Sequence, residues 1–172
     1  MTAPARRLIK PTTPRTVHLL NLSGALTSPV QAEATTEADF VRLAALCPNV
    51  VHIVSQPETF ELPDRRYTPD YRIECRGGRV SYWEVKLEKR IDEYRPTFGA
   101  MAALTATKDA RFFAISNTSI RRSAQHKVAQ LIHRYAKAQP SRDAIHQVLS
   151  IAGGCWRRLK FDPPVRALPT QM

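Results

Sequence analysis

The chain has 172 residues, with 26 Lys and Arg against 15 Asp and Glu, which gives a formal net charge of +11 and a pI near 10.1. This length suits one domain, and a hydrophobic share of 43% is enough to build a core, which argues against a largely disordered chain. No apolar run approaches the roughly 18 residues that cross a bilayer, and the start lacks the apolar stretch of a secretory signal. We therefore expect a cytoplasmic protein that has no membrane contact.

The excess of basic residues lies at the two ends of the chain. Residues 1–29 contain four basic residues and no acid, residues 30–116 contain 12 basic and 13 acidic residues, and residues 117–172 contain ten basic and two acidic residues. Basic ends around a balanced middle suit a polyanion, because Lys and Arg displace the counterions of a phosphate backbone. On charge alone, a solvated basic surface that keeps the protein soluble remains the alternative.

The order of elements predicts an α/β core between two basic extensions. Four prolines predict an irregular arm over residues 1–30. A helix is expected from Thr35 or Thr36, as N-cap, to the stop at Pro48, followed by strands over residues 50–54 and 59–62. The core is placed at residues 31–116, and a basic helical extension at residues 117–172.

Later segments follow the same logic. Residues 66–76 and 80–87 flank Gly77 and Gly78, which predicts a β-hairpin. A helix is expected over residues 90–107 and a strand over residues 111–116. An amphipathic helix with an apolar stripe is expected over residues 120–135, and a shorter helix, capped by Ser141, runs to Ala152.

The register of the hairpin decides which side chains share a face. A two-residue turn places Asp70 opposite Val85, whereas a three-residue loop over residues 77–79 places it opposite Lys86, with Arg72 opposite Glu84. The second register puts the apolar residues of both strands on one face, so we favour it. It predicts that Asp70, Glu84 and Lys86 share the other face.

Carboxylates and an ammonium on one sheet face have a definite chemical use. Mg²⁺ takes oxygen ligands and keeps several waters, so Asp70, Glu84 and the Val85 carbonyl could supply the protein's share. Lys86 could position a water or offset charge in the transition state. Glu37 shares the inward face of the first helix and could complete the set. Taken singly, each residue also fits an ordinary surface salt bridge.

At these residues the chain resembles the PD-(D/E)XK nuclease superfamily, and more narrowly the TnsA-like transposon endonucleases. The resemblance covers residues 30–150. It rests on Thr36-Glu37-Ala38-Asp39-Phe40, Pro48-Asn49-Val50-Val51, Ser55-Gln56-Pro57, Arg66-Tyr67-Thr68-Pro69-Asp70-Tyr71 and Glu84-Val85-Lys86. It implies catalytic roles for Glu37, Asp70, Glu84 and Lys86, with metal ligation by the three carboxylates, and a place near the site for Gln56, which otherwise suits a turn before Pro57.

The resemblance also implies a fold and a reaction. The fold is a restriction-endonuclease-like α/β core with a central mixed sheet flanked by helices. The reaction is a Mg²⁺-dependent cut of one DNA strand at each transposon end, with Mn²⁺ expected to substitute, while a partner transposase cuts and joins the other strand. A regulatory ATPase and a second copy of the chain are further expected partners. Relatives continue into a winged-helix domain, for which the residues after Gly154 are too few.

Basic residues in the C-terminal extension are the expected DNA contacts. These are Arg121, Arg122, Lys127, Arg134, Arg157 and Arg158. Two alternatives stay open: a stand-alone phage or mobile-element nuclease that nicks DNA or resolves junctions, and, from another class, a non-catalytic DNA-binding scaffold subunit.

Overall fold

The computed structural model describes residues 17–22, 29–135, 141 and 143. The strands are β1 (His18–Leu20), β2 (Val30–Ala32), β3 (Val50–Ser55), β4 (Phe60–Glu61), β5 (Arg66–Tyr67), β6 (Tyr71–Cys75), β7 (Val80–Lys86) and β8 (Ala110–Ser116). The helices are α1 (Thr35–Ala45), α2 (Arg95–Ala106), α3 (Asn117–Arg122) and α4 (Ala124–Tyr135), and the short 3₁₀ turns are η1 (Glu88–Arg90) and η2 (Asp92–Tyr94).

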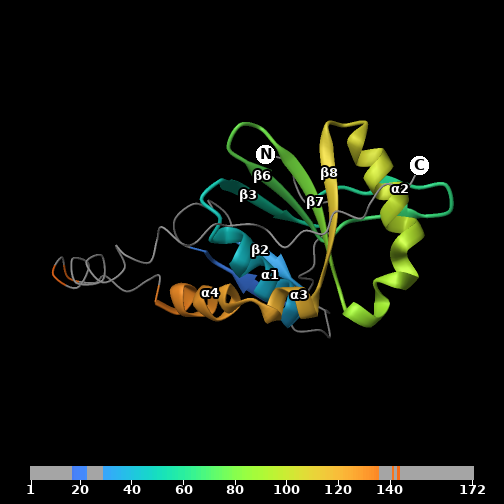
Figure 1. The fold of residues 1–172 in the computed structure, drawn as a ribbon. Helices are drawn as coiled ribbons and strands as arrows, with labels where there is room; N and C mark the ends of the chain where they lie inside the picture. The colour runs from blue at the N-terminus through green and yellow to red at the C-terminus, as the bar shows by residue number, and fades with distance from the viewer. Residues whose placement is uncertain (1–16, 23–28, 136–140, 142, 144–172) are drawn as a thin grey trace.

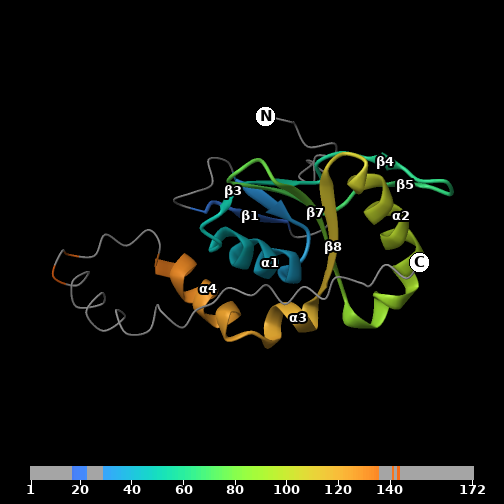
Figure 2. The ribbon, with the colours of Figure 1, turned by 45° about the horizontal axis from the view of Figure 1, so that its top comes forward.

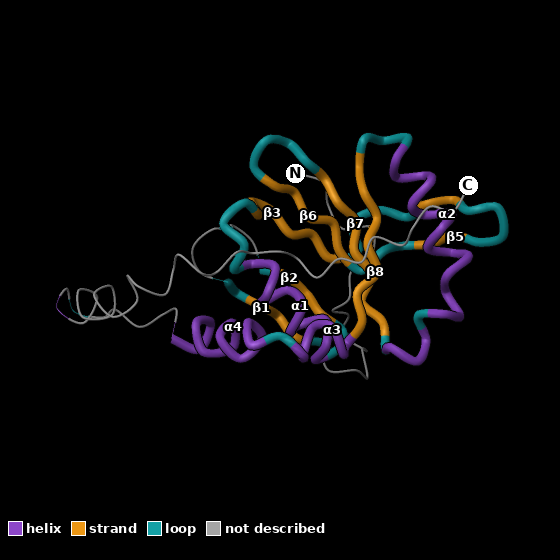
Figure 3. The backbone as a smooth tube through the Cα atoms, viewed as in Figure 1, coloured by secondary structure: helices purple, strands orange, loops and turns teal. Residues whose placement is uncertain are grey.

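A mixed four-stranded sheet in the order β3-β6-β7-β8 forms the centre of the fold (Figures 1 and 3). The pairs β3-β6 and β6-β7 are antiparallel, whereas β8 runs parallel to β7 because α2 carries the chain back to the same end of the sheet. The pairs β1-β2 and β4-β5 form separate small ribbons. The predicted α/β architecture, with a mixed central sheet flanked by helices, is therefore confirmed.

The predicted register of the β6-β7 hairpin is wrong by two residues. Arg72 pairs with Tyr82, not with Glu84, and Glu74 pairs with Val80. The turn occupies residues 76–78, with Gly77 at φ 83° and Gly78 at φ 78°, and the Cys75 amide donates to the Arg79 carbonyl at 2.9 Å. A shift of two keeps every side chain on its predicted face, so the hydrophobic pattern could not detect it.

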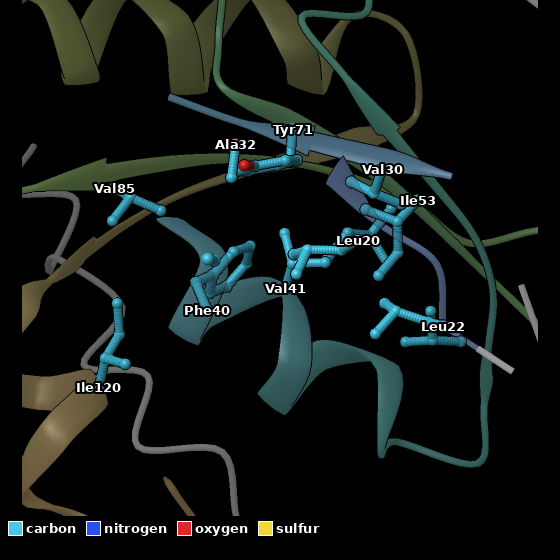
Figure 4. Packing of buried hydrophobic residues seen from close by; sticks show 13 residues of the cluster. Leu20, Leu22, Val30, Ala32, Phe40, Val41, Ile53, Tyr71, Val85 and Ile120 are labelled. Carbon is cyan, nitrogen blue, oxygen red and sulfur yellow. The ribbon is translucent and has the colours of Figure 1, made fainter. Parts of the chain in front are cut away.

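One face of the sheet packs against α1 and the β1-β2 ribbon. The Phe40 ring lies 5.6 Å from the Tyr71 ring and 5.2 Å from the Trp83 ring, measured between centroids. Figure 4 shows Phe40 and Val41 of α1 projecting toward the sheet, with Ile120 of α3 nearby. Aromatic and β-branched side chains at helical spacing thus supply the largest apolar cluster of the fold.

The opposite face packs against α2 and the β4-β5 ribbon. Tyr82 and Met101 are buried there with Phe60, whose ring meets the Tyr82 ring edge-on at 5.1 Å. α2 begins at Arg95, five residues later than predicted, because Pro96 is tolerated in the first helical turn and not further inside. The preceding residues form η1 and η2 instead.

Two further differences concern helix starts and the N-terminal arm. The N-cap of α1 is Ala34, not Thr35 or Thr36, and it makes no side-chain cap. The expectation of an irregular arm is wrong for β1, which pairs with β2, because Leu20 and Leu22 find a place in the core beneath α1. The expected helix over residues 141–152 lies almost wholly outside the described residues.

The expected long helix over residues 120–135 is divided at Ser123 into α3 and α4, which pack beside α1 (Figure 2). α4 turns its polar side toward α1: His133 pairs with the Arg42 carbonyl at 2.9 Å, and Ala129 is fully buried. Its apolar stripe faces outward, with Val128, Leu131, Ile132 and Tyr135 between 44% and 62% exposed. This is the reverse of the usual orientation of an amphipathic helix.

Asp39 joins these three helices from a buried position in α1. Its side chain is 3% exposed and pairs with Arg42 at 3.1 Å, Arg121 at 3.3 Å and His126 at 3.2 Å. No helix in the described part of the chain is long and apolar enough to cross a bilayer.

Replacement of Asp39 tests this junction. We expect Asp39→Ala to lower the free energy of unfolding by about 2 kcal/mol, because two arginines and a histidine lose a buried partner. Urea denaturation measures the change. The exposed Asp64–Arg65 pair provides the control, since Asp64→Ala should cost less than about 0.5 kcal/mol. Equal effects of the two variants would contradict a structural role for Asp39.

Candidate active site at the end of β6 and β7

Asp70 lies just before β6, where the chain is held by backbone contacts from two directions. Its carbonyl accepts the Gln56 amide at 2.8 Å, and its Oδ2 accepts the Val85 amide at 2.9 Å. Gln56 is buried and has φ 48°, a left-handed conformation that few non-glycine residues adopt. This places Gln56 beside Asp70 through its backbone.

The observed register brings Asp70 level with Glu84 across the hairpin, because Tyr71 pairs with Trp83. The Glu84 side chain is 2% exposed. Its Oε1 pairs with the Lys86 ammonium, and contacts with the Tyr67 hydroxyl and the Asp70 amide also oppose the rise of its pKa. The buried Tyr67 hydroxyl faces Glu84, and burial, followed by the charge of Glu84, raises the pKa of Tyr67.

Burial dominates the electrostatics of this carboxylate pair. Asp70 retains partial solvent access as a residue, but its carboxyl group is packed deeply enough that desolvation, followed by the charges of Glu84 and Glu37, raises its pKa well above the ordinary value. Desolvation also raises the pKa of Glu84, against the opposing charge of Lys86. Burial acts to lower the pKa of Lys86, but the charge and hydrogen bond of Glu84, together with the charge of Asp70, outweigh burial, and the pKa of Lys86 is raised.

Glu37 reaches the same region from α1, on the other side of Tyr71. Its Oε2 accepts the Glu33 amide at 2.8 Å and the Tyr71 hydroxyl at 3.4 Å. The first contact ties down the start of α1, as a capping carboxylate does. Burial raises the pKa of Glu37, and the charge of Glu84 contributes to the rise. The charge of Glu84 therefore affects the pKa of Glu37. The two hydrogen bonds of Glu37 would also suit a residue with a purely structural role.

The carboxylates have the chemistry of a site for a hard divalent cation. Within the described ranges, no three or more His, Cys, Asp and Glu side chains are grouped as a metal site, and the role of Glu37 as a third ligand stays a prediction. Mg²⁺, however, is commonly held by one or two carboxylates and several waters. Asp70 and Glu84 fit that pattern, since each carboxylate raises the cost of ionising its neighbour and a cation would relieve that repulsion.

Two aromatic residues at this site were not assigned a role from sequence. Tyr67 belongs to the quoted Tyr-Thr-Pro-Asp phrase, yet only the fold shows that its hydroxyl points at Glu84. Tyr94 lies with its ring 5.1 Å from the Lys86 ammonium. No local pattern links residues 86 and 94, because the intervening turns determine where the ring lies.

The predicted DNA contacts have different environments. Arg122, Lys127 and Arg134 are exposed on α3 and α4, whereas Arg121 pairs with the buried Asp39. Arg157 and Arg158 lie outside the described residues. α3 begins directly after Ser116, which is level with Lys86 in the parallel β7-β8 pair, so the basic helices start at the carboxylate end of the sheet.

Comparison with known proteins provides no family assignment. No protein-family model matches the chain, and no curated protein matches it.

The strain in the carboxylate pair predicts that Asp70→Asn stabilises the metal-free protein. Because its pKa is raised in the folded state, Asp70 contributes stability that is present below its ordinary pKa and is lost as the pH rises through the raised value. An amide keeps an acceptor for the Val85 amide without the charge. We expect a gain of about 1 kcal/mol at pH 7 in EDTA, with a weaker dependence of stability on acidic pH.

Thermal unfolding across a pH series measures this effect. Glu61→Gln is the control, because Glu61 is an exposed carboxylate paired with Arg66 at 2.8 Å and should change little. A loss of stability in Asp70→Asn would show that the Asp70 charge is stabilising in the folded protein.

Proposed function

We propose that the chain is a metal-dependent endonuclease that hydrolyses phosphodiester bonds in double-stranded DNA. The observation that carries this proposal is the pair of carboxylates Asp70 and Glu84 at one end of the β6-β7 hairpin, with the Lys86 ammonium paired to Glu84. Isolated anions are costly away from water, so such a pair suits a cation and a substrate rather than a packing role. Mg²⁺ is the proposed ion, with Mn²⁺ as a substitute and the Val85 carbonyl as a further oxygen ligand.

Each residue then has a role in hydrolysis. Bound Mg²⁺ would supply an acidified water and would neutralise charge on the scissile phosphate. Asp70 and Glu84 place two carboxylates side by side on the hairpin, where they would hold the ion. The Lys86 ammonium offsets the charge that develops on the phosphate. The water oxygen bonds to phosphorus as one ester bond to a sugar oxygen breaks. The water's proton passes to solvent, and the leaving sugar oxygen takes up a proton from solvent, so the products are a phosphate end and a hydroxyl end.

The finer proposal is a TnsA-like enzyme with a restriction-endonuclease-like core. In this role it would cut one strand at transposon ends as the endonuclease subunit of a heteromeric transposase. The order Glu37, Gln56, Asp70, Glu84 and Lys86 along the chain supports it, together with the backbone contact between Gln56 and Asp70. The proposed partners are DNA, a transposase, a regulatory ATPase and a second copy of the chain.

The scaffold alternative has its own supporting observation. The contacts of Glu37 with the Glu33 amide and Tyr71, and of Glu84 with Lys86, are ones that a non-catalytic protein could keep for stability. Cleavage assays distinguish a scaffold from an enzyme. Cleavage in the absence of a transposase would instead favour a stand-alone phage or mobile-element nuclease.

The central prediction concerns cleavage. Asp70→Ala and Glu84→Ala should reduce Mg²⁺-dependent nicking by at least about a hundredfold while DNA binding in EDTA is kept, because the variants remove metal ligands and not phosphate contacts. Lys86→Ala should reduce nicking about as strongly. The assay uses supercoiled plasmid and transposon-end DNA, with and without a partner transposase, in Mg²⁺ or Mn²⁺.

Glu61→Ala is the matched control, since it removes an exposed carboxylate of the same fold. If the wild-type protein cuts no DNA under any of these conditions, or if Asp70→Ala cuts like the wild type, the nuclease proposal is wrong.

The exposed basic residues of α3 and α4 should make phosphate contacts. The combined change of Arg122, Lys127 and Arg134 to Ala should reduce the slope of log K against log salt concentration by about 2 to 3, because each phosphate contact contributes about 0.9. Fluorescence anisotropy on a labelled duplex measures the slope. The triple change of Arg65, Arg76 and Arg79, all exposed away from these helices, is the control for total charge. Equal slopes for the two triple variants would remove α3 and α4 from the DNA interface.

A further inference from the structure

The turns η1 and η2 follow directly after Lys86 and border the carboxylate site. The start of η1 is attached to the beginning of α3, since the Glu88 amide donates to Asn117 Oδ1 at 2.8 Å. The other end runs into α2. The segment is thus held at both ends, and its side chains have defined positions next to the site.

Tyr94 is shared by two cations. Its ring centroid lies 5.1 Å from Lys86 Nζ and 5.2 Å from the guanidinium carbon of Arg90. Both distances are within the range of a cation–π contact. The aromatic ring therefore connects the site lysine with an arginine on the protein surface.

Arg90 is exposed and yet held by several contacts. One terminal nitrogen donates to the Tyr94 hydroxyl at 2.7 Å, and Nε donates to Glu93 at 3.2 Å. The side chain is 45% exposed. An arginine fixed before binding loses less conformational entropy when it meets a ligand, and its planar fork of donors matches the oxygens of a phosphate.

Resting on the proposed nuclease function, we propose that Arg90 binds a DNA backbone phosphate adjacent to the scissile one. The incoming phosphate replaces the Glu93 carboxylate on the guanidinium. Tyr94 is a positioning residue that keeps Arg90 and Lys86 at a fixed separation, so that the substrate strand meets both cations at once. The substrate contact thus extends beyond α3 and α4 to the η1 and η2 turns that follow Lys86.

The first test is binding in EDTA, measured by anisotropy on a labelled duplex across a salt series. Arg90→Ala should weaken binding about tenfold and reduce the salt slope by about 1, as expected for one lost phosphate contact. Arg65→Ala is a closely matched control, because Arg65 is 49% exposed and pairs with Asp64 as Arg90 pairs with Glu93. Arg65→Ala should leave affinity and slope unchanged.

The second test concerns the competing carboxylate. Glu93→Gln should tighten DNA binding severalfold, because the phosphate no longer displaces a charged partner from Arg90. Asp64→Asn removes the same charge at the control pair and should have a much smaller effect. Equal gains in the two variants would show that only the total charge matters, which would overturn the exchange at Arg90.

The third test separates the two functions of Tyr94 under Mg²⁺ turnover. Tyr94→Phe keeps the ring near Lys86 but loses the hydroxyl that holds Arg90, so KM should rise about threefold with kcat unchanged. Tyr94→Leu loses the ring as well, so kcat should also fall. If the two variants behave alike in both constants, Tyr94 has no separate positioning role.

Failure of this inference differs from failure of the proposed function. If the wild type cuts DNA and Arg90→Ala binds and cuts like the wild type, only the role of Arg90 is wrong. If the wild type binds DNA but never cuts it, the nuclease proposal is wrong, and the EDTA measurements still decide whether Arg90 contacts phosphate. A wild type that binds no duplex would overturn both.

Discussion

The hydrogen bond from the Val85 amide to the Asp70 carboxylate joins the end of one strand of the hairpin to the loop before the other. It fixes Asp70 level with Glu84, and the Gln56 amide fixes the Asp70 backbone from the β3 side. Since Lys86 is two residues beyond Glu84 on the same strand, its place follows from the same contact. The geometry of the candidate site therefore depends on two backbone amides, those of Val85 and Gln56, that hold Asp70 against the sheet.

The site brings carboxylates close together, which destabilises the folded state. The packing of the rest of the fold offsets that cost. Desolvation raises the pKa of Asp70, Glu84 and Glu37, so ionisation of each carboxylate costs more in the folded protein than in water. Two apolar clusters, one beneath α1 and one beneath α2, hold the sheet from its two faces. This separation of a strained polar edge from a well-packed interior is typical of sites where binding a charged ligand matters more than stability.

Basic groups approach the carboxylates from two directions. α3 starts beside Lys86 and leads to exposed Arg122, while the turns after β7 present Arg90. The buried Asp39 connects α3 and α4 to α1, so the position of the first basic group depends on the core. The second depends on Tyr94, which contacts Lys86 itself. Basic groups on two separate elements, α3 and the turns after β7, thus lie at the same end of the sheet as the carboxylate pair.

Local sequence determined much of this protein. β-branched runs, Gly77-Gly78 and Pro48 located the strands, the hairpin and the end of α1, and the alternation of apolar residues placed Asp70, Glu84 and Lys86 on one face. Because alternation has a period of two, it could not distinguish registers that differ by two residues, and only the hydrogen bonds of the turn selected the one that sets Asp70 level with Glu84. Tertiary packing alone brought Tyr67 to Glu84, Tyr94 to Lys86 and Arg121 to Asp39, since residues distant in sequence meet only when the whole chain folds.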